Sequence, residues 1–254
     1  MNDNSKLQLL NLLPGWAVGK LMRAKYERMI GGGGEAELSQ LPRIVRKDDL
    51  AIDVGSNLGI YTYALSQLAK QVIAFEPIPL FAKFVRNQAL PNVTVRECAL
   101  SATDGERELC VPEEGAAYAT LRDDAPTGNV KHLKVTTRTL DALGLSRIGF
   151  LKIAVEGFEE AVLNGARATI DRDKPRLLVK IEERHNVGGP DRIVAMLESM
   201  GYSCSFFDNG NWNPIADFNL ALDQNPDTLD NPVEGRRYIN NFLFLPQGEA
   251  LQGG

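Results

Sequence analysis

The feature that most constrains the fold is a change of pattern at Leu50, after which short apolar runs alternate with amphipathic stretches. Such alternation is typical of a parallel sheet with helices on its faces. We predict the main strands over residues 50–54, 71–75, 93–97, 150–153 and 176–181. Helices are predicted over residues 59–69, 80–88, 159–165 and 191–200. The pattern therefore predicts an α/β fold with a doubly wound, mostly parallel sheet.

Further strands are expected outside this regular part. Residues 109–111 and 134–139 are strand-like, and the aromatic and apolar runs 202–207 and 238–245 predict an antiparallel pair at the sheet edge. A pure nucleotide-binding half does not need such a pair. The polar loop 116–131 is long enough for a substrate lid, although an ordinary surface excursion explains it equally well.

The N-terminal part has a different pattern. Residues 5–30 predict short helices with one apolar face, and the four glycines at 31–34 are expected to interrupt them, because glycine loses much backbone entropy on ordering. We therefore divide the chain into a helical extension over residues 1–45 and a main domain over residues 46–250. Packing on the main domain is the simplest role for these helices. Residues 7–16, which include Leu7, Leu10 and Trp16, also suit a weak peripheral contact with a membrane or a partner.

Composition narrows the partners and the compartment. The formal net charge of −5 and the pI near 5.2 provide no broad basic field, so nucleic acid is not expected as a partner. The three cysteines are scattered and lack metal-site spacing. No apolar stretch approaches the roughly 20 residues of a membrane-spanning helix. We expect a cytoplasmic protein with reduced thiols, whose oligomeric state these numbers do not set.

The segment Asp53-Val-Gly-Ser-Asn-Leu-Gly59 joins the first predicted strand to a helix, where open α/β sheets bind ligands. A dinucleotide fingerprint would have a glycine at Asn57, which argues against a nicotinamide-dependent oxidoreductase. Glu76, at the tip of the second strand, suits the ribose hydroxyls of nicotinamide and adenosylmethionine cofactors alike. A turn without any ligand remains an alternative, with Asp53 as a helix cap and Glu76 in a solvated turn.

Three motifs together resemble the FkbM family of methyltransferases. They are the Asp53–Gly59 segment with Tyr61-Thr62, then Ala74-Phe-Glu-Pro77, and then Leu151-Lys-Ile-Ala-Val-Glu-Gly-Phe-Glu159. The likeness runs from about residue 46 to residue 246. It implies a class I, Rossmann-like methyltransferase that uses S-adenosylmethionine as its cofactor and methylates a hydroxyl of a sugar, a glycan or a secondary metabolite.

The resemblance also implies which residues bind the cofactor. The methionine end would be lined by Asp53, Gly55, Ser56, Asn57 and Gly59. The ribose would be held at Glu76 and Pro77, and the adenine would pass the segment 98–100 with Ala99. Ala154 would lie near the methyl donor.

The sequence departs from the family at two positions. The family usually has Lys-Ile-Asp-Val-Glu-Gly where this chain has Ala154, and it tends to carry an acid at the position of Lys180. Lys152 and Lys180 on adjacent buried strands would need carboxylate partners, for which Glu156 and Glu182 are the candidates. The changes leave open a second interpretation, a catalytically impaired nucleoside-binding module.

Methyl transfer to oxygen requires a positioned hydroxyl and a group that takes its proton. The candidate catalytic residues are Glu156, Glu182, His185 and Lys152. Among these, His185 is attractive because an unperturbed imidazole titrates at roughly pH 6.5, although a lone loop histidine often lies simply at the surface. Glu159 is expected to begin a helix, where its charge suits the dipole. No ligand spacing demands a metal ion, and none is predicted.

Overall fold

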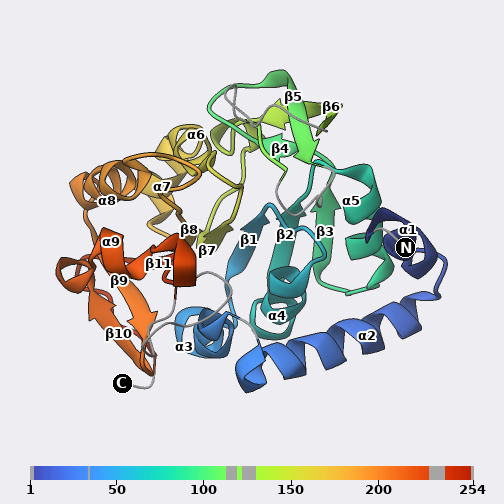
Figure 1. Ribbon diagram of the computed structural model, residues 1–254, viewed down its shortest axis with the longest axis horizontal. Helices are drawn as coiled ribbons and strands as arrows, with labels where there is room; N and C mark the ends of the chain where they lie inside the picture. Colours follow the sequence, from blue (N-terminus) through green and yellow to red (C-terminus); the bar gives the residue numbers. More distant parts are fainter. Residues whose placement is uncertain (1–2, 34, 113–118, 122–129, 229–237, 253–254) are drawn as a thin grey trace.

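The computed structural model describes residues 3–33, 35–112, 119–121, 130–228 and 238–252. Its main sheet consists of eight strands. Their bounds are Leu50–Val54 for β1, Gln71–Phe75 for β2, Val93–Arg96 for β3, Ile148–Ile153 for β7, Arg176–Lys180 for β8, Tyr202–Asp208 for β9, Asn211–Pro214 for β10 and Asn241–Pro246 for β11. In space they follow the order β10-β9-β11-β8-β7-β1-β2-β3 (Figure 1).

A second sheet lies beside the carboxyl ends of the parallel strands (Figure 1). It contains β4 (Ala99–Leu100), β5 (Gly105–Pro112) and β6 (Val130–Arg138), in the order β4-β6-β5. The strand-like pieces predicted at 109–111 and 134–139 fall within β5 and β6, and the sequence did not show that they form a sheet of their own. Of the loop interpreted as a lid or a surface excursion, residues 116–118 and 122–129 lie outside the described residues.

The helices connect the strands and cover both faces of the sheet. Their bounds are Asp3–Leu10 for α1, Gly15–Arg28 for α2, Leu41–Ile44 for α3, Ile60–Leu68 for α4, Pro79–Asn87 for α5, Glu159–Asn164 for α6, Arg167–Asp173 for α7, Gly189–Ser199 for α8 and Leu220–Asp223 for α9. The predicted main strands and helices are confirmed to within a few residues. None of the helices in the described residues is long and apolar enough to span a bilayer.

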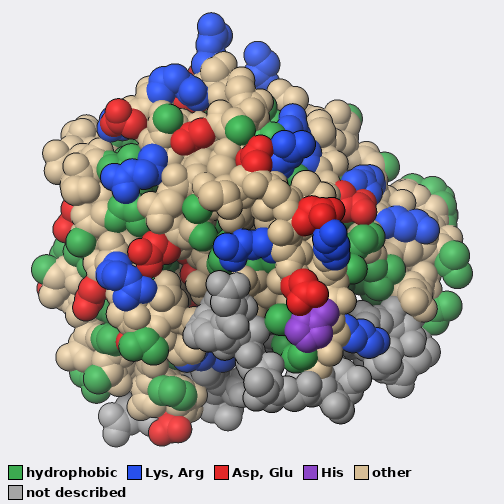
Figure 2. All heavy atoms as spheres, turned by 90° about the horizontal axis from the view of Figure 1, so that it is seen from above, with side chains coloured by type: hydrophobic (Ala, Val, Ile, Leu, Met, Phe, Trp, Pro, Cys, Tyr) green, Lys and Arg blue, Asp and Glu red, His purple; other side chains and the backbone are tan. Residues whose placement is uncertain are grey.

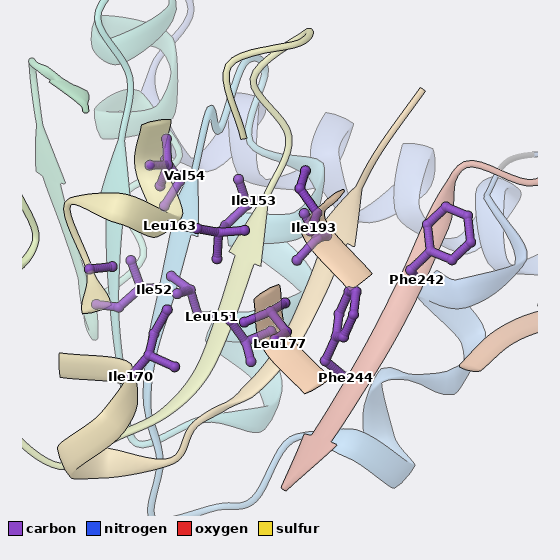
Figure 3. Packing of buried hydrophobic residues seen from close by; sticks show 14 of the residues in the cluster. Ile52, Val54, Leu151, Ile153, Leu163, Ile170, Leu177, Ile193, Phe242 and Phe244 are labelled. Carbon is purple, nitrogen blue, oxygen red and sulfur yellow. The ribbon is translucent and has the colours of Figure 1, made fainter. Parts of the chain in front are cut away.

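Alternating side chains of the strands build two separate apolar layers. Ala51 and Phe150 contact α3 and α4 on one face of the sheet. On the other face Ile52, Leu151 and Leu177 pack against α6, α7 and α8, as Figure 3 shows. Burial on both faces explains why these strands are continuous apolar runs in the sequence.

The structure corrects one prediction about secondary structure, refines a second and adds a helix that was not predicted. The glycines after α2 do not end the helical course, because Met29–Gly33 forms a π-helical turn; Gly34 lies outside the described residues. The antiparallel pair β9 and β11 is confirmed, but β11 lies between β8 and β9, and the edge strand is β10. α7 was not predicted, since its sequence Arg-Ala-Thr-Ile-Asp-Arg-Asp lacks a clear apolar period.

Candidate cofactor pocket and catalytic cluster

The pocket lies where the order of the sheet reverses. β1 pairs in parallel with β2 on one side and with β7 on the other, so the connections that leave its carboxyl end diverge. Open α/β sheets bind ligands at such a switch point. The pocket there has an empty volume of about 570 Å³, a figure that includes its open mouth.

Gly55 is required by the close approach of β1 and β7. Its φ of +76° lies in the left-handed region, and a Cβ atom at this position would be 2.1 Å from the Ala154 carbonyl oxygen. The Gly55 amide donates to the Phe75 carbonyl oxygen at 3.0 Å, which fixes the turn against β2. Any other residue would push the loop away from β7, and the pocket wall would be lost.

Glu76 is held at the tip of β2 by two backbone donors. Its Oε2 accepts from the Asn57 amide at 2.7 Å and its Oε1 from the Ile78 amide at 3.0 Å. Burial raises its pKa to about 7, although the two amide donors oppose the shift. A carboxylate has about four acceptor positions, so Glu76 keeps capacity for the hydroxyl groups of a ligand in the pocket.

Asp53 and Ser56 lie behind the pocket wall. Asp53 accepts a hydrogen bond from the Thr62 hydroxyl at 2.6 Å, which ties β1 to α4, and burial raises its pKa to about 6. The Ser56 hydroxyl is buried and has no hydrogen-bond partner among the described residues. A polar ligand that reached this oxygen would satisfy it.

The predicted cofactor-binding residues divide into two groups. Those that line the pocket are Gly55, Asn57, Glu76, Pro77, Ala99 and Ala154. Those that do not line it are Asp53, Ser56 and Gly59, which shape the loop from behind. Sequence reasoning missed Ile78 and Phe81, which directly follow the second motif and therefore had a local signal. The roles that the sequence predicts for the residues of both groups in binding a ligand stay predictions.

The second sheet closes one side of the pocket. Leu109 of β5 contributes its side chain to the wall, and so does Leu121, which lies outside the strands. The Thr120 hydroxyl donates to the Glu156 carbonyl oxygen at 2.9 Å, and Thr120 also pairs with Cys110 of β5 through two backbone hydrogen bonds. This contact fixes the turn after β7 from a segment far away in the chain. No local sequence signal identified Thr120.

Glu156 connects the pocket to a cluster of charged groups. It lines the pocket, and its Oε1 accepts from the Lys180 ammonium at 2.9 Å. Its Oε2 lies 3.0 Å from His185 Nε2, although the pair does not meet hydrogen-bond geometry. Lys180 is also 2.9 Å from Glu182 Oε1, whose other oxygen accepts from Arg184 at 2.6 Å. The structure therefore brings together three of the four predicted catalytic residues.

The cluster holds both carboxylates in the ionised state. Burial of Glu156 opposes ionisation, but His185 and Lys180 outweigh burial and lower its pKa to about 2. In Glu182 the same burial is outweighed by Arg184 and Lys180, so its pKa is lowered as well. Burial alone would lower the pKa of Lys180, yet the two carboxylates raise it. The ammonium and the carboxylates therefore keep each other charged.

Glu156, Glu182 and His185 offer ligand atoms within 4.8 Å of one another, a spacing that a metal ion could use. The Lys180 ammonium already lies within 2.9 Å of both carboxylates. A metal ion would have to displace this cation, and the lysine supplies the positive charge without one. Our prediction of no metal stays a prediction.

Lys152 lies apart from this cluster. Its ammonium donates to Asn241 Oδ1 at 2.8 Å and stands 4.8 Å from the centre of the Tyr61 ring. The side chain is only 1% exposed and does not line the pocket, and burial lowers its pKa. The expected pairing with Glu156 and Glu182 is thus confirmed for Lys180 and wrong for Lys152. The two lysines leave adjacent strands, but Lys152 meets β11 and α4 before it can reach the carboxylates.

Glu159 begins α6, as expected, and is buried. Its Oε1 accepts from the Gly157 amide at 3.0 Å, while its Oε2 has no partner among the described residues. Burial raises its pKa to about 7. Its position fixes the turn between β7 and α6.

A doubly wound sheet with a glycine turn after β1 and a buried acid at the tip of β2 defines the Rossmann-like class of nucleoside-cofactor enzymes. The particular member of this class follows from sequence comparison. The family described as "Methyltransferase FkbM domain" matches residues 53–204, more than half of the chain. The chain belongs to this family of S-adenosylmethionine-dependent methyltransferases.

Curated relatives agree with this assignment. The chain is 28% identical over 196 residues to Methyltransferase 1 of Beauveria bassiana, covering 66% of this chain and 77% of that protein. It is 28% identical over 197 residues to 31-O-demethyl-FK506 methyltransferase FkbM of Streptomyces tacrolimicus, covering 63% and 74%. Methyltransferase sdnD of Sordaria araneosa is 29% identical over 203 residues, covering 64% and 76%.

A solved structure supports the fold alone. The crystal structure of methyltransferase FkbM from Methylobacillus flagellatus matches with a TM-score of 0.51 at 16% identity. The match covers 78% of this chain, which spans 44% of the length of that protein. The predicted class I architecture is confirmed.

S-adenosylmethionine is the cofactor of this family, and the pocket fits it. Glu76 retains acceptor capacity for hydroxyls at the rim, and the buried Ser56 hydroxyl lacks a partner behind the glycine turn. Gly55 and Ala154 leave the wall between them free of large side chains. When bound, the cofactor supplies an electrophilic methyl group.

Proposed function

We propose that this enzyme methylates a hydroxyl group of a small molecule, a sugar or glycan or a secondary metabolite, as an O-methyltransferase. The observation that carries the proposal is Glu156, which lines the cofactor pocket and contacts His185. It joins the place of the methyl donor to a group able to take a proton. One relative is named a 31-O-demethyl-FK506 methyltransferase, a name that puts its reaction at an oxygen atom.

His185 is the general base in this proposal. A carboxylate with a pKa near 2, such as Glu156, is a weak base at neutral pH. Its oxygen at 3.0 Å from Nε2 orients the imidazole and stabilises it after protonation. The other ring nitrogen, Nδ1, then takes the hydroxyl proton. Lys180 fixes Glu156, and Glu182 fixes Lys180, so both act as positioning residues.

The setting of the reaction is also part of the proposal. Lys, Arg, Asp and Glu side chains are interspersed over the visible face at the carboxyl edge of the sheet, which favours a small acceptor over nucleic acid (Figure 2). All three cysteines are free, which supports a reducing, cytoplasmic location. We also propose that the chain divides into an N-terminal extension over residues 1–45 and a main domain over residues 46–250.

Calorimetric titration with S-adenosylmethionine, followed by methyl transfer to a panel of hydroxyl compounds, tests this function. At about 100 times its dissociation constant the cofactor should stabilise the fold by roughly 2.7 kcal/mol. Glu76→Gln should weaken binding, because the neutral amide is a poorer acceptor for ribose hydroxyls. The matched control is Glu106→Gln, at an exposed position paired with Lys134. Tight cofactor binding without methylation of any oxygen acceptor would overturn the proposal.

A second candidate, an impaired module that binds the nucleoside without turnover, is favoured by Ala154 and Lys180. Ala154 brings no carboxylate to the pocket, and Lys180 occupies Glu156. The double variant Ala154→Asp with Lys180→Glu restores the acids usual in the family. If the module is impaired, the double variant gains turnover that the parent lacks. Turnover in the parent, unchanged or lower in the variant, would exclude this candidate.

A further inference from the structure

The corner between α1 and α2, defined here as residues 9–16, exposes large apolar side chains. Leu12 is 78% exposed, Trp16 69% and Leu9 54%. Soluble surfaces rarely gather such side chains without a function. The cofactor pocket and the charged cluster give them no role.

The corner is held in place by its inward side. Val18 and Met22 of α2 are buried against Phe81 and Phe84 of α5, together with Leu7 of α1. The Asn11 side chain also donates to the Leu80 carbonyl oxygen at 3.2 Å. The outward leucines and Trp16 are therefore not frayed core residues, because the core positions of these helices are filled by others.

Positive charge adjoins the apolar corner. The Lys20 ammonium stands 5.3 Å from the centre of the Trp16 ring, and Arg23 and Arg28 follow on exposed positions of α2. The one acid of α2 is Glu27, which is paired with Arg23. In a chain with a formal net charge of −5, this helix is a local exception. It is complementary to an anionic surface.

The corner lies at the outside of the molecule. Figure 1 places α1 and α2 along one edge, and Figure 2 shows hydrophobic side chains at the same side. An outer edge with tryptophan, leucine and flanking lysine or arginine suits the boundary between lipid headgroups and acyl chains.

We propose that this corner docks on an anionic lipid surface. Leu9, Leu12 and Trp16 enter the headgroup boundary, while Lys20 and Arg28 contact the anionic headgroups. Phe81 packs beneath the corner and also lines the cofactor pocket, so the docked face adjoins the pocket. The proposal stands independently of the acceptor.

Sedimentation of the full chain with vesicles tests it. One set contains phosphatidylcholine and phosphatidylserine in equal parts, and the other contains phosphatidylcholine alone. We expect partition onto the anionic set that falls with added salt and is at least about tenfold weaker for Leu12→Glu with Trp16→Glu. Leu222→Glu is the matched control, since Leu222 is an exposed leucine on α9, outside the corner.

A fluorescence measurement covers the case in which the corner variant fails to fold. Trp16 and Trp212 are the two tryptophans of the chain, so Trp212→Phe leaves Trp16 as the reporter. Its emission should shift to the blue with anionic vesicles. An unshifted emission, or equal sedimentation of parent and corner variant, overturns the proposal. Light scattering that shows a dimer of the parent, disrupted in the corner variant, would also overturn the proposal. The occupant of the corner would then be a second copy of the chain.

Discussion

Lys152 and Lys180 lie on neighbouring strands of one sheet, but their side chains have different environments. Lys152 on β7 is fully enclosed and has an amide oxygen and an aromatic ring as neighbours. Lys180, at the end of β8, lies between two carboxylates. Burial disfavours the charge of both, yet the pKa of Lys152 is lowered and that of Lys180 is raised. Burial decides the direction for Lys152, whereas the two carboxylates outweigh burial for Lys180, and only the second environment adjoins the pocket.

The largest effect is expected from removing the cation between the carboxylates. Lys180→Met should lower the free energy of unfolding by about 3 kcal/mol at neutral pH, because the buried carboxylates of Glu156 and Glu182 would lose the cation that lies between them. Urea denaturation measures the change. The deficit should shrink in mild acid, when one carboxyl takes up a proton.

Two variants sharpen that result. Lys152→Met should cost about 1–2 kcal/mol, since a methionine fills the same space and avoids burying an ammonium but leaves Asn241 Oδ1 without its donor. Lys134→Met, at an exposed ion pair with Glu106, should change little. An equal loss for Lys152→Met and Lys180→Met would show that the two environments do not differ as described.

The next effect concerns turnover. His185→Gln should lower kcat about 100-fold with a smaller change in KM, as expected for loss of a general base. Lys152→Met should leave kcat close to the parent value, because the Lys152 ammonium lies against Asn241 and Tyr61, outside both the pocket lining and the charged cluster around Glu156. His132→Gln is the matched control, as the exposed second histidine of the chain. If both histidine variants lose the same activity, His185 has no special role.

Acid should destabilise the Lys180 environment. The pKa of Glu156 is about 2 in the folded chain and 4.5 ordinarily, so its contribution is present above pH 4.5 and is lost as the pH falls toward 2. We expect a loss of about 2 kcal/mol over this window, absent in Glu156→Gln. Glu76 and Glu159 have pKa values raised to about 7, so their contributions have the opposite sign: they increase the free energy of unfolding as the pH falls from 7 to 4.5. Unfolding free energies across pH, parent against variant, separate the contributions.

The smallest effect distinguishes the two lysines in alkali. Because the pKa of Lys180 is raised, its stabilising contribution to the free energy of unfolding stays intact up to pH 10.5 and is lost above that pH. Because the pKa of Lys152 is lowered, the cost of burying its charge disappears as the pH approaches 10.5. The stability of the parent relative to Lys152→Met should therefore rise by roughly 0.5 kcal/mol, while that relative to Lys180→Met stays flat. Parallel curves for the two variants would contradict the opposite shifts.

Local pattern was enough for most of the fold. The apolar run of β1 and the amphipathic period of α4 predicted both elements, because their burial depends on periodicities that are visible in the sequence. The π-helical turn at Met29–Gly33 was not predictable from glycine propensity, since the packing of Tyr26 and Met29 against the sheet core holds the turn. The place of β11 inside the sheet was equally hidden, because strand order is a long-range property.

The candidate site was predictable only where its residues share a motif. Gly55 and Glu76 follow strand ends and could be assigned to the pocket edge from sequence alone. Thr120 could not, because it reaches Glu156 from a distant segment. The separate surroundings of Lys152 were also hidden, since Asn241 and Tyr61 come from opposite ends of the main domain.

The sequence by itself determined the α/β class, the glycine turn after β1 and the family, because each is encoded in short segments. The tertiary structure alone decided which lysine meets the carboxylates, which residues face the pocket and which leucines remain exposed. Side-chain environments arise from contacts between elements far apart in the chain, and the energy of a buried charge depends on those contacts.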